Sequence, residues 1–132
     1  MPRYFTNGSE ELSTVKKSTR VKKNWGEEIW IINNSCLPYG AKILRLENNK
    51  YSSYHYHFIK TETFYVLKGK VRIICEYGVE FILRAGESLN IKRTKHHQFR
   101  REGNSLAEIL EVSDSHHIGL DTYRISKHWM GS

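Results

Sequence analysis

From Trp25 onward the chain carries short runs of β-branched and aromatic residues, and turn-forming residues separate one run from the next. No stretch among these runs shows the 3.6-residue period of an amphipathic helix. The pattern predicts about eight short strands with frequent turns, which is typical of an antiparallel sandwich or barrel. The expected strands occupy residues 28–32, 41–47, 53–58, 63–76 with a break near Gly69, 79–84, 88–92, 96–101 and 106–113.

The chain of 132 residues is long enough for one domain with one core. Its composition, 39% hydrophobic and 27% charged, is ordinary for a folded protein. The apolar runs are short and the N-terminus has no hydrophobic signal region, so we expect neither a membrane span nor a secretory leader. A cytoplasmic protein is the simplest interpretation. Cys36 and Cys75 are too few for a disulfide framework, and we interpret both as small buried hydrophobic residues.

The net charge of +7 is concentrated at the N-terminus, where residues 1–24 hold six Lys or Arg against two Glu. A polar, basic segment of this kind is most often a solvated flexible arm, and we do not expect a nucleic acid as its partner. We therefore divide the chain into a basic arm at 1–24, a β-domain at 25–126 and a C-terminal tail at 127–132.

Three candidate metal ligands stand in the segment SSYHYHFIKTETFYVLKG, residues 52–69. Because side chains alternate along a strand, His55 and His57 share one face, and their imidazoles can converge on a single ion. Glu62 follows a short turn and shares the apolar face of its strand with Phe64 and Val66. An unpaired buried carboxylate is costly, and a divalent cation would remove that cost. The segment therefore predicts a metal site.

A further ligand is expected from the segment GESLNIKRTKHHQF, residues 86–99, in which His96 or His97 follows a polar turn. Nitrogen and oxygen ligands without sulfur suit one divalent ion of Zn, Mn, Fe, Co or Ni. The sequence does not choose among these metals.

The first of these segments resembles a signature motif of the cupin superfamily. The motif is carried by the spacing His55-x-His57, four residues, Glu62, six residues and Gly69. The resemblance implies a single-domain antiparallel jelly-roll β-barrel over roughly residues 25–125, with a metal ion near its open mouth held by three histidines and one glutamate.

The second segment is similar to the second cupin motif, and it selects between the two candidate histidines. Gly86 is followed eleven residues later by His97, and residues 92–96 correspond to the Pro-x-Gly-x-x stretch of the motif. The implied metal ligands are therefore His55, His57, Glu62 and His97. The sequence departs from the motifs at four positions: Asn49 replaces a leading glycine, Lys92 and Thr94 replace the proline and glycine, and Arg101 replaces a common asparagine.

Three further stretches are similar to phosphomannose isomerase-like cupins, which include a domain of bifunctional mannose-6-phosphate isomerases and several aldose isomerases. They are KKNWGEEIWIIN, YGAKILRL and EVSDSHHIGLDTYRI. The resemblance implies a metal-dependent isomerase of a sugar or sugar phosphate. Such a reaction needs a Lewis acid on the sugar oxygens and a base that moves a proton between two carbons.

Glu111, at the start of the EVS stretch, is the first candidate for this base, and His96 and Lys60 are the others. The sequence does not tell whether the face of its strand that carries Glu111 is the interior. Positive charge near the mouth would bind a phosphate or carboxylate, and the candidates are Arg45, Lys42, Lys60 and Arg124.

Two other classes of function remain open at this point. The protein can be a non-catalytic metal- or sugar-binding module, or another cupin enzyme. The latter includes an iron dioxygenase with the same ligands and a metal-free nucleotide-sugar ketoisomerase in which His55 and His57 act as acid and base. We also expect a homodimer, with Tyr54, Tyr56 and Tyr65 as contact surface if they point outward.

Overall fold

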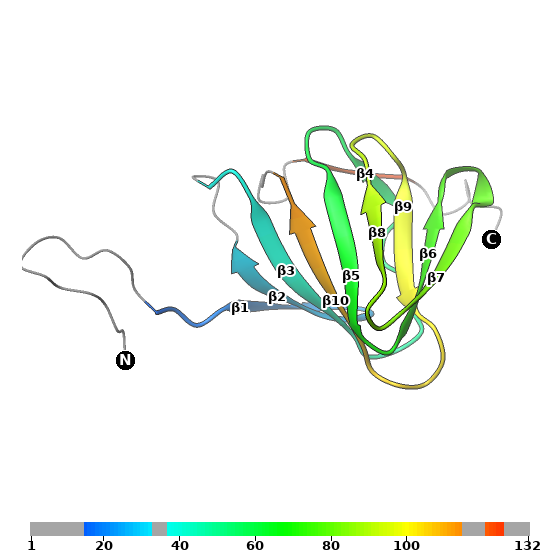
Figure 1. Ribbon diagram of the computed structural model, residues 1–132, viewed down its shortest axis with the longest axis horizontal. Coiled ribbons are helices and arrows are strands. Elements are labelled where there is room, and N and C mark those ends of the chain that lie inside the picture. The colour runs from blue at the N-terminus through cyan, green and yellow to red at the C-terminus, as the bar shows by residue number, and fades with distance from the viewer. Residues whose placement is uncertain (1–14, 33–36, 115–120, 126–132) are drawn as a thin grey trace, which may run out of the picture.

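The protein is described by a computed structural model, which covers residues 15–32, 37–114 and 121–125. Two antiparallel sheets pack face to face, as the sequence predicts, and form the all-β jelly roll (Figure 1). The larger sheet has the order β1 (Thr19–Lys23), β2 (Gly26–Ile32), β3 (Gly40–Leu46), β10 (Ala107–Ser113), β5 (Glu62–Lys68) and β8 (Ser88–Ile91). The smaller sheet has the order β11 (Thr122–Arg124), β4 (His55–His57), β9 (His97–Arg101), β6 (Lys70–Cys75) and β7 (Glu80–Arg84).

A single hydrophobic core fills the space between the sheets. Strand alternation sends every second residue inward, so that β5 buries Phe64 and Val66, β10 buries Ala107 and Ile109, and β6 buries Val71 and Ile73, all with little or no exposed surface. Cys75 packs against this core, whereas Cys36 lies outside the described residues.

The glycine that ends the first motif is required by close backbone packing. Gly69 has a φ of +75°, and a Cβ atom there would lie 2.6 Å from the carbonyl oxygen of Leu106 and 2.9 Å from the Cα of Ala107. Because only glycine accepts both conditions without strain, this position closes the β5–β6 hairpin against the start of β10.

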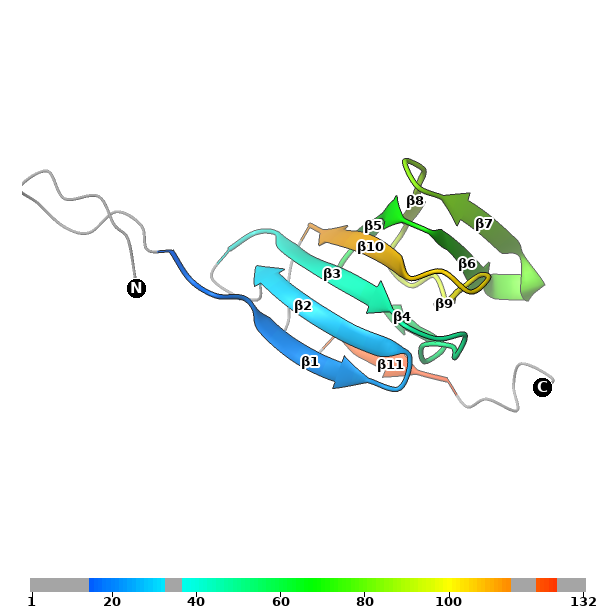
Figure 2. The same ribbon diagram turned by 90° about the horizontal axis from the view of Figure 1, so that it is seen from below.

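The predicted boundary of the basic arm at residue 24 needs correction. Residues 19–23 form β1 and pair with β2, as Figure 2 shows along the edge of the larger sheet. The reason is charge pairing across the hairpin: Arg20 lies 3.1 Å from Glu27, and Lys23 lies 3.8 Å from Glu28. Basic residues that suggested a solvated arm are therefore cross-strand partners of acidic ones. The predicted tail at 127–132 lies outside the described residues.

None of the described residues belongs to a helix that is long and apolar enough to cross a membrane. The one helical element in the described ranges is a single 3-10 turn, Glu76–Gly78, between β6 and β7.

Candidate metal centre and pocket

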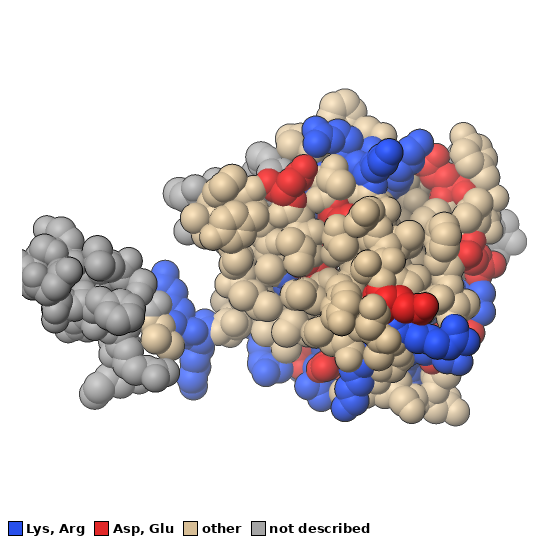
Figure 3. Space-filling view, viewed as in Figure 1, with Lys and Arg blue, Asp and Glu red and all other residues tan. Residues whose placement is uncertain are grey.

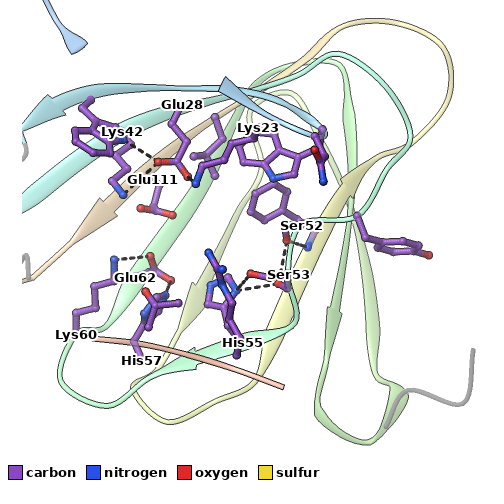
Figure 4. A pocket seen from close by; sticks show the side chains of 18 residues that line it. Lys23, Glu28, Lys42, Ser52, Ser53, His55, His57, Lys60, Glu62 and Glu111 are labelled. Carbon is purple, nitrogen blue, oxygen red and sulfur yellow. Dashed lines mark hydrogen bonds and ion pairs between the residues drawn. The ribbon is translucent and has the colours of Figure 1, made fainter. Parts of the chain in front are cut away.

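A pocket of about 730 Å³ lies between the two sheets (Figure 4). A volume of this size is in the range that holds a small-molecule ligand. The larger sheet contributes acidic and amino side chains to its wall, and the smaller sheet contributes histidines and Arg124. The full lining is Lys23, Asn24, Trp25, Glu28, Trp30, Lys42, Leu44, Tyr51, Ser52, Ser53, His55, His57, Lys60, Glu62, Phe99, Glu111, Thr122 and Arg124.

Three histidines meet at one end of this pocket. His55 and His57 come from β4, His97 comes from the neighbouring β9, and His55 is the register partner of His97. One nitrogen of each ring lies within 4.8 Å of a nitrogen of each other ring, close enough for the three to hold one metal ion. The structure thus brings together the histidines that the two motifs select.

Each of the three rings is held by a backbone carbonyl on its outer side. The Nδ1 atom of His55 lies 2.8 Å from the oxygen of Ser53, that of His57 lies 3.0 Å from the oxygen of Asp121, and that of His97 lies 3.0 Å from the oxygen of Lys95. A carbonyl only accepts a hydrogen bond, so in each neutral ring Nδ1 carries the proton and Nε2 keeps its lone pair. This arrangement orients metal-binding histidines in proteins generally.

Glu62 places its carboxylate against two of these lone pairs. Its Oε1 atom lies 3.1 Å from Nε2 of His57 and 3.2 Å from Nε2 of His97. The Glu62 side chain is 1% exposed. Its Oε2 atom is paired with the Lys60 ammonium at 3.3 Å, but within the described ranges Oε1 of Glu62 and Nε2 of His97 have no hydrogen-bond partner. Oε1 and the two Nε2 atoms thus place three electron-rich atoms together in a buried position, which is unfavourable without a cation among them.

The separations fit ligands that share a metal. With metal–ligand bonds of about 2.1 Å, neighbouring ligand atoms stand about 3.0 Å apart at a right angle and about 3.4 Å apart at the tetrahedral angle. The distances of 3.1 and 3.2 Å between the Glu62 carboxylate and the two imidazoles lie between these limits. The donor set present in the chain therefore fits a divalent cation.

The electrostatics around His55 favour its neutral form. Burial, and after it the nearby His97 and His57, lower the pKa of His55 to about 3. Burial alone would raise the pKa of Glu62, but hydrogen bonds from the His57 and His97 rings, where a ring carries a proton on Nε2, and the Lys60 ammonium hold that pKa well below its usual value. A neutral histidine and an ionised carboxylate are the forms that bind metal.

Lys60 stands beside the cluster, where its Nζ atom lies 3.3 Å from Oε2 of Glu62. Burial alone would lower the pKa of Lys60, but the negative charges of Glu62, Glu111 and Asp121 raise it overall. Lys60 is therefore a buried ammonium group in contact with one predicted metal ligand.

Glu111 faces the pocket from β10, which settles what the sequence left open about its strand. It shares its face with the buried Ala107 and Ile109, and Figure 4 shows it between Lys42 on one side and the Lys60–Glu62 pair on the other. Burial, followed by the charge of Glu62, raises the pKa of Glu111 to about 8. The carboxyl group thus lies near the histidine cluster without being part of it.

A second charged cluster at the far wall of the pocket was missed by the sequence reasoning. Glu28 accepts a 2.8 Å hydrogen bond from the indole of Trp30 and lies 3.5 Å from the Nζ atom of Lys42, with Lys23 on its other oxygen (Figure 4). Lys42 also lies over the Trp30 ring. The available signal was strand alternation, because Glu28 and Trp30 are two residues apart and share a face.

Two predicted site residues do not reach the pocket. Arg45 lies on the outer face of β3 with Glu108 at 3.5 Å, because it is three residues from the inward-facing Lys42. His96 precedes the inward-facing His97, so its ring points the other way, 2.8 Å from Glu76 and stacked on Tyr54. Their predicted roles in substrate binding and proton transfer are therefore not supported by their positions. Lys42, Lys60 and Arg124 do line the pocket.

The predicted contact tyrosines divide between the two sheets. Tyr54 is buried beneath His96, so it does not offer free surface, and Tyr56 stacks on Tyr123 of β11. Tyr65 is exposed on the outer face of the larger sheet. Trp25 packs in the core against Phe99.

The departures from the motifs keep the geometry of the turn before His97. Thr94 stands where the motif has glycine and adopts a left-handed φ of +69°, and its N–H donates to the carbonyl oxygen of His57. At two of the other positions, Arg101 donates a 2.9 Å hydrogen bond from Nε to the side-chain oxygen of Asn49. These two replacements thus contact each other.

Comparison with known proteins gives a family and a fold. Solved structures resemble the chain at identities low enough to show the fold alone. Capsular polysaccharide assembling protein CapF from Staphylococcus aureus has a TM-score of 0.73 and 16% identity, over 85% of this chain and 35% of that chain. The chain thus spans about a third of the length of CapF.

Two other similar structures have nearly the length of this chain. An uncharacterized conserved protein with a double-stranded beta-helix domain from Klebsiella pneumoniae has a TM-score of 0.65 and 15% identity, over 92% of this chain and 89% of that chain. The Streptomyces nucleoside dehydratase Pac13 has a TM-score of 0.70 and 11% identity, over 89% and 92%. No curated protein matches the chain. Residues 42–113, more than half of the chain, match the family described as Cupin domain, and the chain belongs to this cupin family.

Proposed function

We propose that the protein is a metal-dependent enzyme that interconverts the aldose and ketose forms of a sugar or sugar phosphate. The proposed metal ligands are His55, His57, His97 and Glu62. One observation carries the proposal: Glu111 lies next to the histidine–glutamate cluster, inside the same pocket, and is left over as an acid–base group. A fold shared with the nucleoside dehydratase Pac13 is compatible with catalysis.

A divalent cation held by these ligands would supply Lewis-acid polarisation of a substrate carbonyl oxygen. The remaining steps belong to the chain. The Glu111 carboxylate takes the proton from the carbon beside the carbonyl and returns it to the former carbonyl carbon of the resulting enediolate. A second proton passes from the hydroxyl oxygen to the former carbonyl oxygen, so that the proton count is unchanged. Lys60 and Lys42, on either side of Glu111, favour its ionised form when it acts as the base.

The polar wall of the pocket provides groups for a hydroxylated substrate. Lys42, Lys60 and Arg124 can donate to hydroxyl, phosphate or carboxylate oxygens. Trp30 offers an indole surface for the apolar face of a sugar ring. The space of about 730 Å³ exceeds that of a free hexose, which leaves room for a phosphate or a second substituent.

The test follows proton exchange as well as product. Protein loaded with each of Mn, Fe, Co, Ni and Zn is incubated in D₂O with free and phosphorylated aldoses, and NMR records ketose and deuterium at the reacting carbons. Glu111→Gln is the matched variant, because it keeps the shape of the side chain and removes the base. We expect metal-dependent deuterium incorporation in the wild type and its loss in the variant with metal content unchanged.

Other outcomes would assign the alternatives. Oxygen consumption with Fe(II) would indicate a dioxygenase, and a rate that survives chelation would indicate metal-free acid–base catalysis by histidines. Tight sugar binding without deuterium exchange under any metal would refute isomerisation and indicate a binding module.

The proposed partner in solution is a second copy of the chain. Ile29, Ile43, Leu110 and Tyr65 are register partners in one row across β2, β3, β10 and β5, on the outer face of the larger sheet. The face seen in Figure 3 has few charged residues at its centre over β10, β5 and β8. Such a row suits a homodimer contact. Tyr65→Lys should shift the mass measured by light scattering toward the monomer, and an unchanged mass would contradict this contact.

A further inference from the structure

We infer that Asp121 is a positioning residue that couples the docking of strand β11 to the affinity of the histidine cluster for a divalent cation. The inference rests on the metal site of the proposed function and does not depend on isomerisation. Asp121 is 3% exposed and stands directly before β11. It contacts the cluster in two ways, through its side chain and through its backbone.

The side chain of Asp121 holds the turn that joins two of the proposed ligands. Oδ1 accepts hydrogen bonds from the backbone N–H groups of Phe58 and Ile59 at 2.9 and 3.0 Å, and Oδ2 accepts from those of Ile59 and Lys60, both at 3.0 Å. These three consecutive amides lie between His57 and Glu62. One buried carboxylate thus fixes the backbone that sets the spacing of an imidazole and a carboxylate.

The backbone carbonyl of Asp121 holds one of the ligands itself. It accepts the Nδ1 proton of His57 at 3.0 Å, which keeps the lone pair of that ring on Nε2, toward the pocket. β11 then continues along β4, with Thr122 opposite His57 and Arg124 opposite His55. If β11 undocks, His57 loses the hydrogen bond that orients it, and three amides of the turn before Glu62 lose their hydrogen bonds to Asp121 at the same time.

Coupling of this kind is reciprocal. A cation that binds better when β11 is docked must stabilise the docked strand by the same free energy. The cluster and β11 are therefore expected to respond to each other in the wild-type protein, without any substitution.

Asp114 provides a matched comparison within the same turn. Its Oδ1 atom accepts a 2.9 Å hydrogen bond from the backbone N–H of Thr61, directly after the amides that Asp121 binds. The Asp114 side chain is 51% exposed, and among the described residues its carboxylate contacts Thr61 and Arg93 rather than a histidine. A carboxylate that only caps the turn should behave like Asp114.

The first experiment compares Asp121→Asn with Asp114→Asn. In Asp121→Asn an amide NH₂ group faces backbone N–H groups, so bonds to the turn are lost with little change in volume. Affinity for Zn²⁺ and Co²⁺ is measured by competition with a chelator, on protein shown to be folded by circular dichroism. We expect binding weaker by about 10- to 100-fold for Asp121→Asn and within about twofold of wild type for Asp114→Asn. Equal effects of the two substitutions would overturn the inference.

The second experiment uses the wild-type protein and so does not depend on the variant folding. Two-dimensional ¹H–¹⁵N NMR of the metal-free protein reports the tautomer of His57, and hydrogen exchange reports the amides of Phe58, Ile59 and Lys60. We expect the Nδ1–H tautomer and slower exchange when Zn²⁺ is added. The Nε2–H tautomer, or exchange rates that Zn²⁺ leaves unchanged, would overturn the inference.

Failure of the inference and failure of the proposed function give different results. A protein that binds Zn²⁺ with the expected coupling but isomerises no sugar leaves the role of Asp121 standing. A wild-type protein without affinity for any divalent ion overturns both.

Discussion

Lys60→Met distinguishes the effects of two positive partners of Glu62 in the pocket, the ammonium group of Lys60 and the proposed metal ion. The substitution keeps the length and apolar stem of the side chain and removes its charge. The Nζ atom of Lys60 lies 3.3 Å from Oε2 of Glu62, and the two side chains are 8% and 1% exposed. The metal-free variant is left with a buried carboxylate whose remaining close neighbours are His57 and His97.

The expected cost follows from this burial. A pair of unit charges 3.3 Å apart interacts by about 5 kcal/mol at an effective dielectric constant of 20. Removing one partner of a buried pair typically costs 3–5 kcal/mol, and we take about 3 kcal/mol because His57 and His97 still face Oε1 of Glu62. We therefore expect the free energy of unfolding of the metal-free variant to fall by about 3 kcal/mol.

The effect on metal affinity has the opposite sign. Lys60 and a divalent cation at the cluster repel each other, and both attract the same carboxylate. Removing the ammonium group should therefore strengthen metal binding, by about tenfold if about 1.4 kcal/mol of repulsion is relieved. Stability falls while affinity rises, and this pair of changes is specific to a lysine that competes with a metal.

Urea denaturation in the presence of a chelator measures the stability, and competition with a chelator measures the affinity for Zn²⁺. Lys68→Met is the control. Lys68 is an exposed lysine at the end of β5, the strand that carries Glu62, and its substitution should change the free energy of unfolding by less than about 0.5 kcal/mol. A metal-free Lys60→Met protein as stable as wild type, or one with weaker metal binding, would refute the reasoning.

Three further predictions concern the ligands and the turn. His57→Ala should sharply lower the metal content of the purified protein by elemental analysis, since it removes one proposed ligand beside Glu62; undiminished occupancy would argue against the assignment. Thr94→Gly should raise the free energy of unfolding by about 0.5–1 kcal/mol, because it relieves the left-handed backbone strain of a β-branched residue at φ +69°. The greater entropy of glycine in the unfolded chain offsets part of this gain. A loss of stability in urea denaturation would contradict the prediction. The folded pKa of His55, about 3, lies below the ordinary histidine value of 6.5, so the unfolded chain binds more protons than the folded chain between these values. The metal-free protein should therefore lose stability as pH falls from about 6.5 toward 3, by at most about 1.4 kcal/mol per pH unit. His55→Gln should flatten this slope, and an equal slope in that variant would exclude His55 as its cause.

Strand alternation explains how much of the site could be predicted from the sequence. His55 and His57 are two residues apart, and Glu62 shares its face with Phe64, so their inward direction follows from local geometry alone. The same rule would have rejected two candidates. Arg45 is an odd number of residues from the inward-facing Lys42, and His96 is next to the inward-facing His97. Arg45 and His96 therefore take the outward face of their segments.

The remaining parts of the site depend on contacts between segments that are far apart in the chain. Asp121 reaches amides 61 to 63 residues earlier, and nothing in its own neighbourhood of sequence indicates this. The cluster around Glu28 depends on the pairing of β1, β2 and β3, which brings Lys23 and Lys42 to one carboxylate. Alternation shows that Glu28 and Trp30 share a face, but periodicity in one strand cannot reveal which strands pair beside it.

The two sheets contribute different groups to the site, so the distance between the sheets affects the proposed function. The imidazoles come from the smaller sheet, whereas Glu62 and Glu111 come from the larger one. The distance from the histidine cluster to the proposed base is therefore set by the core that separates the sheets. Phe64 of β5 is one core contact between the sheets beside the cluster, with its ring centroid 5.8 Å from that of His97 and 6.1 Å from that of Phe99. A smaller side chain at Phe64 would allow the two sheets to move relative to each other. Because Glu62, a proposed metal ligand, and Glu111, the proposed base, are both on the larger sheet, metal binding and proton transfer should both weaken in such a variant.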